Sequence, residues 1–336
     1  MSPTSLKAIT QKIGKLFTTM AFAASLGLSS SVVMSQPSHA VEPHEFAKPS
    51  DLATKALLLD VAQIGPRLVA IGEYGHILLS DDEGENWRQA ASVPTRNTLT
   101  SLLFVDNKIG YAVGHEATIL KTEDGGENWV MQYNERRGEN PLFGIYFSSA
   151  TQGIAVGGFS TVLETSDGGQ TWAPRSLIAD SYDDFHLNGI FVSTSGAVFV
   201  PAEFGTIYRS SDGGATFESL ATPYDGSFWG GMALNNGSIL VWGMRGNAYF
   251  SDDNGASWSK SETNSDRSIS GGTQLEDGRI VLAGLSGSVL VSSDGGKTFT
   301  ATVRPDRLSF ATASSGPDDT VLLYGDPGIL PHTLNN

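Results

Sequence analysis

The chain has 336 residues, of which 39 are glycine, 17% are charged and none is cysteine. Without cysteine neither a disulfide nor a thiol-linked lipid anchor can form, and a 40% content of patterned hydrophobic residues excludes a disordered chain. The 36 acidic against 21 basic side chains give a formal charge of −15. Such a charge repels phosphate backbones, which excludes nucleic acid as a general partner.

The first forty residues are typical of a secretory signal peptide. Three lysines precede the uncharged stretch 16–34, and small residues precede a cut after Ala40. A mitochondrial-type presequence and an uncleaved anchor are the alternatives, which the lack of arginine and the interrupting Ser and Thr residues disfavour. We expect residues 1–40 to be removed, and residues 41–336 to form a single exported, periplasmic domain that does not span a membrane. Loss of the three lysines changes the formal charge to −18.

An eight-residue motif, Ser/Thr-x-Asp-x-Gly-x-Asn/Ser/Thr-Trp/Phe, occurs six times at intervals of 41 to 45 residues. Six copies in near-even register predict a repeat array, although one copy alone would be weak evidence. Each copy of this Asp box is typical of a turn, in which the Asp accepts backbone N–H groups and the aromatic residue packs between sheets. The aspartates predicted to be structural are Asp82, Asp124, Asp167, Asp212, Asp253 and Asp294.

Metal ligation is the alternative role for these aspartates. The run Asp81 to Gly84 faintly resembles a calcium loop, but it lacks the alternate acids and the distal Glu that such a loop needs. The six histidines are scattered and form no ligand pair at metal-binding spacing. We therefore expect no metal and no cofactor.

Each repeat contains three further strand-like runs before its box and one after it. In the second repeat these are residues 102–105, 110–114, 118–122 and 129–133. Four short strands in about 42 residues is the period of a β-propeller blade. We therefore predict an all-β fold, a seven-bladed β-propeller of four-stranded blades.

The seventh repeat has no Asp box. Residues 308–312, 320–325 and 329–330 match its first three strands. We expect its fourth strand to come from Val41 to Ala53, so that pairing of the N- and C-terminal strands closes the ring.

The repeats resemble the photosystem II stability/assembly factor family. The resemblance rests on the Gly-x-Ala/Val-Val-Gly run, the apolar strand and the box of Gly110–Trp129, Gly153–Trp172 and Gly205–Phe217, and it extends over 57–330. It implies a seven-bladed Asp-box propeller that escorts a membrane complex and is not an enzyme. It also implies a patch of arginines in the loops entering successive blades, where this chain has Arg96, Arg136, Arg137, Arg267 and Arg307 among several aspartates.

A glycan-binding or sialidase-like glycosidase propeller is the alternative, because Asp boxes also occur in sialidases. The arginines and tyrosines such an enzyme needs are available in Arg67, Arg245, Tyr74, Tyr208 and Tyr249. However, no Phe-Arg-Ile-Pro segment opens the domain. A cluster of three arginines with a Tyr–Glu pair at the mouth of the central channel would favour this alternative.

The turn between the second and third strands varies from blade to blade, and this variation is what a selective binding surface requires. The same face carries the loops that enter the next blade. We expect these turns and loops to bind an envelope or membrane protein complex, such as a transporter or an assembling complex. The predicted partner-binding residues are Glu73, Tyr74, Arg96, His115, Glu116, Arg137, Phe159, Glu203, Phe204, Arg245, Arg267 and Arg307.

Overall fold

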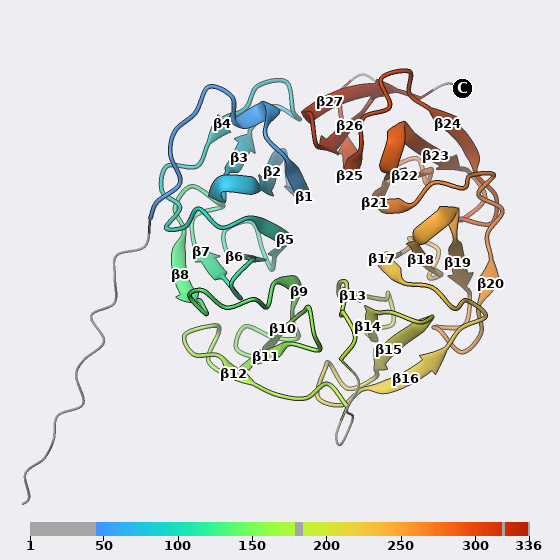
Figure 1. Ribbon diagram of the computed structural model, residues 1–336, viewed down its shortest axis with the longest axis horizontal. Helices are drawn as coiled ribbons and strands as arrows, with labels where there is room; N and C mark the ends of the chain where they lie inside the picture. The colour runs from blue at the N-terminus through green and yellow to red at the C-terminus, as the bar shows by residue number, and fades with distance from the viewer. Residues whose placement is uncertain (1–44, 179–183, 318–319, 335–336) are drawn as a thin grey trace, which may run out of the picture. The chain divides into compact units, whose positions relative to one another are not determined.

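A computed structural model describes residues 45–178, 184–317 and 320–334, and the predicted signal peptide lies outside them. Seven antiparallel sheets stand as blades around a ring, which confirms the predicted seven-bladed propeller (Figure 1). The helical segments in the described residues are four short 3-10 turns, η1 (Ala53–Lys55), η2 (Glu73–Gly75), η3 (Met244–Gly246) and η4 (Leu285–Gly287). Within the same residues no helix has the length and apolarity that a membrane span needs.

The strands of each blade follow the chain from the ring centre outwards. Blades 1 to 4 are β1 (Leu58–Ile64), β2 (Arg67–Gly72), β3 (Ile77–Ser80), β4 (Arg88–Gln89); β5 (Leu99–Phe104), β6 (Gly110–Gly114), β7 (Ile119–Thr122), β8 (Val130–Tyr133); β9 (Leu142–Phe147), β10 (Gly153–Gly157), β11 (Val162–Thr165), β12 (Ala173–Pro174); and β13 (Phe191–Val192), β14 (Val198–Pro201), β15 (Thr206–Ser210), β16 (Glu218–Ala221). Blades 5 to 7 are β17 (Phe228–Ala233), β18 (Ile239–Gly243), β19 (Ala248–Ser251), β20 (Ser259–Lys260); β21 (Ile269–Gln274), β22 (Ile280–Gly284), β23 (Ser288–Ser292), β24 (Thr300–Val303); and β25 (Phe310–Ser315), β26 (Thr320–Gly325), β27 (Gly328–Thr333).

The hydrophobic core is divided among the interfaces between neighbouring blades. Between blades 1 and 2, Val69 and Leu79 pack with Leu99 and Trp129. The box aromatic of the later blade occupies the same place at other interfaces, as Trp172 does between blades 2 and 3. Between blades 6 and 7, where the later blade has no box, Leu330 and Leu334 join the core instead. The aromatic residue of each box therefore holds two sheets together.

Polar side chains also link the inner strands of adjacent blades. The carboxylate of Asp60 on β1 accepts Val61 N and, across the interface, Leu102 N of β5, each at 2.8 Å. Thr100 Oγ1 likewise donates to Leu142 O of blade 3. Burial raises the pKa of Asp60 to about 6, against the opposing effect of these hydrogen bonds.

The predicted closure of the ring by strand pairing is wrong. Within the described residues blade 7 has three strands, and β27 pairs there only with β26. Val41 to His44 lie outside the described residues, while residues 45–53 contain no strand. This segment follows blade 1 instead, where Ala47 N donates to Val93 O. Buried Ala53 then packs into the core between blades 7 and 1, so apolar packing takes the place of a backbone ladder.

The outer edge of blade 7 is protected against pairing with another chain. Pro331 lies on β27 and has no N–H group to donate. Arg304 Nη1 donates to Pro331 O at 3.4 Å and lies 3.2 Å from His332 Nδ1. A proline and a covering cation are two of the features by which edge strands avoid aggregation.

Candidate functional site

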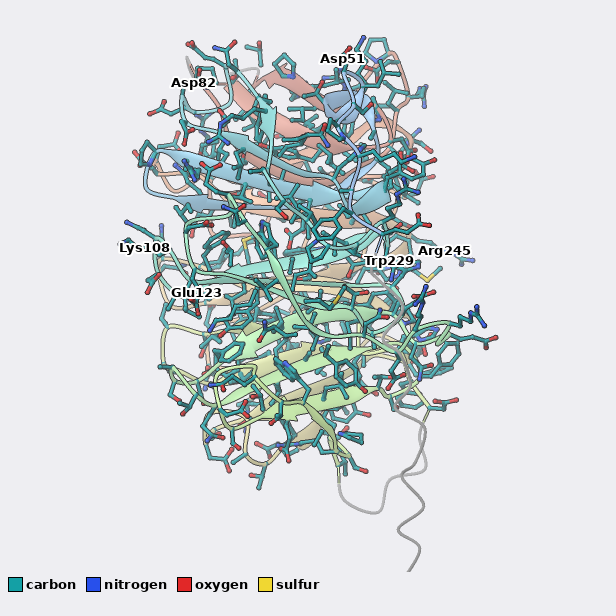
Figure 2. All side chains as sticks on the ribbon, turned by 90° about the vertical axis from the view of Figure 1, so that its left-hand side faces the viewer. Asp51, Asp82, Lys108, Glu123, Trp229 and Arg245 are labelled. Carbon is teal, nitrogen blue, oxygen red and sulfur yellow. The ribbon has the colours of Figure 1, made fainter. Side chains whose placement is uncertain are left out.

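The ring has two faces of different character. Because strands alternate in direction, the Asp boxes lie on one face, and the turns between second and third strands lie on the other with the loops entering the next blade. We call these the box face and the rim face. On the rim face, Glu73 N donates to Leu57 O and His115 N donates to Thr98 O, which ties each turn to the loop entering its blade. Figure 2 shows Asp82 and Glu123 on the side opposite Arg245.

The box carboxylates are occupied by hydrogen bonds within their own turns. Asp167 Oδ1 accepts Thr165 Oγ1 at 2.8 Å and Thr171 N at 2.9 Å, while Oδ2 accepts Thr171 Oγ1 at 2.6 Å. These bonds hold the pKa of Asp167 near 2. The other five boxes repeat the arrangement, with Asp82, Asp124, Asp212, Asp253 and Asp294 as acceptors. No group of three metal-ligating side chains occurs within the described residues.

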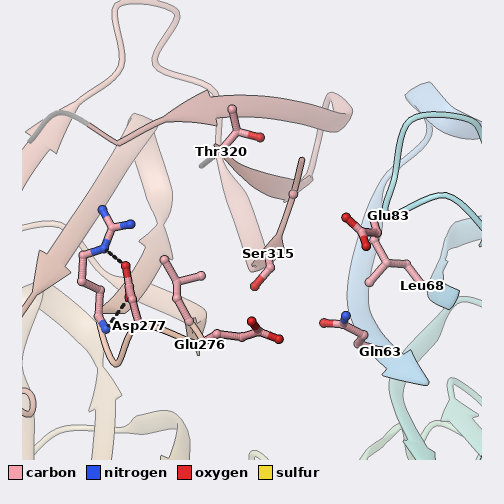
Figure 3. A pocket seen from close by; sticks show the side chains of 10 residues that line it. Gln63, Leu68, Glu83, Glu276, Asp277, Ser315 and Thr320 are labelled. Atoms are coloured by element: carbon pink, nitrogen blue, oxygen red, sulfur yellow. Dashed lines mark hydrogen bonds and ion pairs between the residues drawn. The ribbon is translucent and has the colours of Figure 1, made fainter. Parts of the chain in front are cut away.

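The box face also carries an acidic pocket of ≈ 370 Å³ between blades 6, 7 and 1 (Figure 3). Glu83, Glu276 and Gln63 contribute to its walls. Asp277 is paired with Arg279 at 2.6 Å. Arg279, which also lines the pocket, is therefore occupied by Asp277, and the pocket offers no arrangement from which we derive a chemical step.

The rim turns place their second variable residue in the left-handed region of φ. Tyr74, Glu116, Phe159, Phe204 and Arg245 have φ between 53° and 57°. Bulky side chains rarely adopt this conformation, which raises the free energy of the fold by about 1 kcal/mol or more at each site. Nevertheless Tyr74, Phe159 and Phe204 are 62%, 51% and 68% exposed. The rim face therefore carries exposed aromatic side chains on a backbone that is strained at the turn, and the predicted role of these residues in binding stays a prediction.

Three of the predicted partner-binding residues meet in an arginine pocket of ≈ 290 Å³ over blades 1 to 3. Arg96 comes from the loop entering blade 2, Arg137 from the loop entering blade 3, and Glu116 from the turn of blade 2. Arg136 also lines the pocket. Glu45 pairs with Arg96 at 2.5 Å, and Asn97 Nδ2 donates to Glu116 Oε2 at 3.1 Å.

A second cluster, the aromatic patch, lies over blades 3 and 4 and consists of Phe143, Phe159, Phe185, His186 and Phe204. The Phe159 and His186 rings are 4.8 Å apart, and the Phe185 and Phe204 rings are 5.2 Å apart. Phe143 meets His186 edge-on at 6.3 Å. Phe159 N donates to His186 Nδ1 at 3.1 Å, so the segment containing Phe185 and His186 joins the two turns into one surface.

The remaining predicted residues are dispersed around the rim. Glu73 and Glu203 each accept a backbone N–H of the loop entering their blade, from Leu57 and His186 respectively. Their carboxylates therefore position the turns. His115 is exposed on blade 2. Arg245, Arg267 and Arg307 belong to the turn of blade 5 and the loops entering blades 6 and 7, across the ring from the arginine pocket (Figure 1).

Sequence reasoning missed Phe143, Phe185, His186 and Trp229 as rim residues. Phe143 and Trp229 are the second residues of inner strands β9 and β17, where the register skips one residue. This bulge lies at the rim-face end of each strand, and Figure 2 shows Trp229 on the side of Arg245. The paired Phe185-His186 in a loop was the available signal.

The side chains considered for a sialidase do not converge. Arg67 lies in an ion-pair network with Asp81 and Glu127, and Arg245 is at a rim turn. Tyr208 and Tyr249 are buried. A Tyr–Glu pair does exist, because Tyr133 Oη donates to Glu135 Oε1 at 2.9 Å.

Tyr133 is the last residue of β8, the outermost strand of blade 2, and Glu135 lies in the loop that follows. Burial and the nearby Glu135 carboxylate raise the pKa of Tyr133 to about 12. Because β8 lies at the outside of the ring, this pair is not at the mouth of the central channel, where the glycosidase alternative requires it (Figure 1).

The fold is shared by several solved structures. The structure of YCF48 bound to D1 peptide is 20% identical with a TM-score of 0.66, and the match covers 88% of this chain and 98% of that one. YCF48 from Cyanidioschyzon merolae is 15% identical with a TM-score of 0.62, covering 86% and 98%. Streptogramin B lyase is 11% identical with a TM-score of 0.69, covering 85% and 95%.

An assembly factor and a lyase thus match this chain comparably well, so likeness of fold does not decide function. No curated protein matches the chain. The profile of one family, described as photosynthesis system II assembly factor YCF48, matches residues 80–274, more than half of the chain. The match covers the second to fifth blades, and the boxes and glycine-rich runs that carry the resemblance in the sequence lie in the second, third and fourth of these. The chain belongs to the YCF48 assembly factor family.

Proposed function

We propose that this protein is a non-enzymatic assembly factor, exported to the cell envelope, that binds a segment of an incompletely assembled protein complex on its rim face. The contrast between the two faces carries the proposal. The box face repeats one turn whose carboxylates are satisfied internally. The rim face differs from blade to blade and exposes Tyr74, Phe159 and Phe204.

Aromatic and arginine side chains often dominate the free energy of protein–protein binding. The rim face presents both, with the arginine pocket over blades 1 to 3 and the aromatic patch over blades 3 and 4. The relative bound to D1 peptide supports a polypeptide ligand. The acidic overall charge disfavours a membrane surface or nucleic acid as the main ligand.

Quantitative capture of partners from envelope extracts tests the proposal. The rim variants are Arg96→Ala with Arg137→Ala, and Phe204→Ser; the control is Lys108→Ala with Glu123→Ala on the box face. The four substituted arginine, lysine and glutamate side chains lie at the surface, and Phe204 is exposed. Each variant should therefore melt within a few degrees of the parent. We expect each rim variant to capture at least ten-fold less of a specific partner protein than the parent does, and the control variant to capture as much as the parent. Equal capture by all variants would refute a rim-face function.

A further inference from the structure

The rim face is divided into regions of different charge. The arginine pocket gathers Arg96, Arg136 and Arg137. In contrast, residues 184–208, which form the entry to blade 4, its inner strands and its rim turn, contain no lysine or arginine. Exposed Asp184 and partly exposed Glu203 flank the aromatic patch there. A ligand on the patch therefore meets apolar rings bordered by negative charge.

We propose that the aromatic patch binds an extended polypeptide segment through one bulky apolar side chain that has a lysine or arginine next to it. This inference rests on the proposed rim-face function and names the chemistry of the partner. The apolar side chain packs among Phe159, His186 and Phe204. The adjacent cation lies near the carboxylates of Asp184 and Glu203.

The packing of the rings favours an inserted side chain. Phe159 meets His186 at an interplanar angle of 76°, and Phe185 meets Phe204 at 51°. Tilted rings leave ridges and hollows between them, whereas a sugar stacks best on one flat, open ring face. A side chain placed between tilted rings contacts both a ring face and a ring edge, an arrangement that aromatic groups favour.

The patch is also held in place before any ligand arrives. Ser160 N donates to Phe185 O at 2.8 Å, and Phe159 N donates to His186 Nδ1. His186 N in turn donates to Glu203 Oε2 at 2.9 Å. These bonds fix the turns of blades 3 and 4 on either side of one loop. A preorganised surface loses less conformational entropy on binding than a mobile one.

Synthetic peptides test the inference. We would measure binding of the chain to fluorescein-labelled twelve-residue Gly/Ser peptides by anisotropy. One has a central Phe flanked by lysines, one has the Phe flanked by glutamates, and one has Ser between lysines. We expect the first to bind at least ten-fold more tightly than either of the others, because only it offers both the apolar side chain and the matching charge.

Matched variants then locate the binding. Blade 6 carries Ser286 at the same turn position with φ of 56°, so the turn accommodates serine. Phe159→Ser and Phe204→Ser should each weaken the first peptide by about 30-fold, the change that corresponds to about 2 kcal/mol for a central aromatic contact. Tyr74→Ser, in the same position on blade 1 but outside the patch, should leave its affinity unchanged.

Four results would overturn the inference. They are unchanged affinity in both Phe variants, tighter binding of the glutamate-flanked peptide, an equal loss in Tyr74→Ser, and Phe-dependent binding of a polysaccharide with no binding of the peptides. If the arginine variants lose the captured partner while the Phe variants lose neither partner nor peptide, this inference fails and the rim-face function stands. If no rim variant loses the partner, the rim-face function itself fails.

Discussion

Replacement of box tryptophans by phenylalanine separates ring packing from hydrogen bonding. Trp87 and Trp258 occupy the same box position, and both are partly buried. Trp87 Nε1 donates to Gly84 O at 3.0 Å, whereas Trp258 Nε1 is buried and has no hydrogen-bond partner among the described residues. Phe217 and Phe299 fill this position in blades 4 and 6, so a phenyl ring fits it. Trp87→Phe and Trp258→Phe therefore remove similar ring area but different polar interactions.

The expected difference follows from the energetics of buried polar groups. Trp87→Phe breaks a hydrogen bond and leaves Gly84 O unpaired, at a cost of about 1–2 kcal/mol beyond the lost packing. Trp258→Phe removes a donor that is already unpaired, which offsets part of its lost packing. Calorimetry should therefore show Trp87→Phe melting about 2–8 °C below Trp258→Phe, at about 2–4 °C per kcal/mol for a large domain. If the melting temperature of Trp258→Phe equals or falls below that of Trp87→Phe, the hydrogen bond from Trp87 Nε1 to Gly84 O does not stabilise the fold as we expect.

Three further predictions concern pH, the edge of blade 7 and the N-terminal segment. Since the folded pKa of Asp60 is raised from 3.8 to about 6, stability from this group should increase by up to about 3 kcal/mol as pH falls from 7 to 4. Below pH 4 the total stability should decrease, because the folded pKa values of Asp167, Asp212 and Asp253 are lowered to about 2 and their carboxylates become protonated. Melting temperatures should thus be highest near pH 4. Asp60→Asn should make the melting temperature nearly independent of pH between pH 4 and 6. An unchanged pH dependence in this variant would show that Asp60 is not its cause. Pro331→Val together with Arg304→Ala should uncover the edge of β27 and produce dimers or larger species by size-exclusion chromatography with light scattering, whereas Pro305→Val, an exposed proline outside the strands, should not. Deletion of Val41 to Ala53 should lower the free energy of unfolding by about 1–3 kcal/mol, because the packing of Ala53 on blade 7 is lost, and the protein should stay monomeric. Aggregation without a loss of stability would instead support pairing of this segment with blade 7.

The repeated box made the seven blades predictable, because each copy fixes a turn and an aromatic contact at a constant interval. The predicted strand 110–114 is β6 without change. Closure of the ring was not predictable, because it depends on how a single small residue, Ala53, packs against distant Tyr324 and Ile329. The spacing of hydrophobic residues and the types of turn residue describe local structure, and neither specifies this long-range contact.

The rim face shows the same limit. Turn position identified Phe159 and Phe204 as surface residues from the sequence alone. Phe143 and His186 reach the same patch through a strand bulge and an irregular loop, which do not repeat from blade to blade. The structure adds a role for Glu203 that its turn position does not reveal, because its carboxylate also holds the backbone of His186.

Site-specific photo-crosslinking in cells tests most directly whether the rim face binds a polypeptide. A benzoylphenylalanine replaces Phe204 or Tyr74 on the rim face, or exposed Glu123 on the box face, and mass spectrometry identifies what becomes attached. We predict peptides of one envelope protein attached at Phe204, and none at Glu123. Attachment at Glu123 but not at Phe204 or Tyr74 would contradict the account.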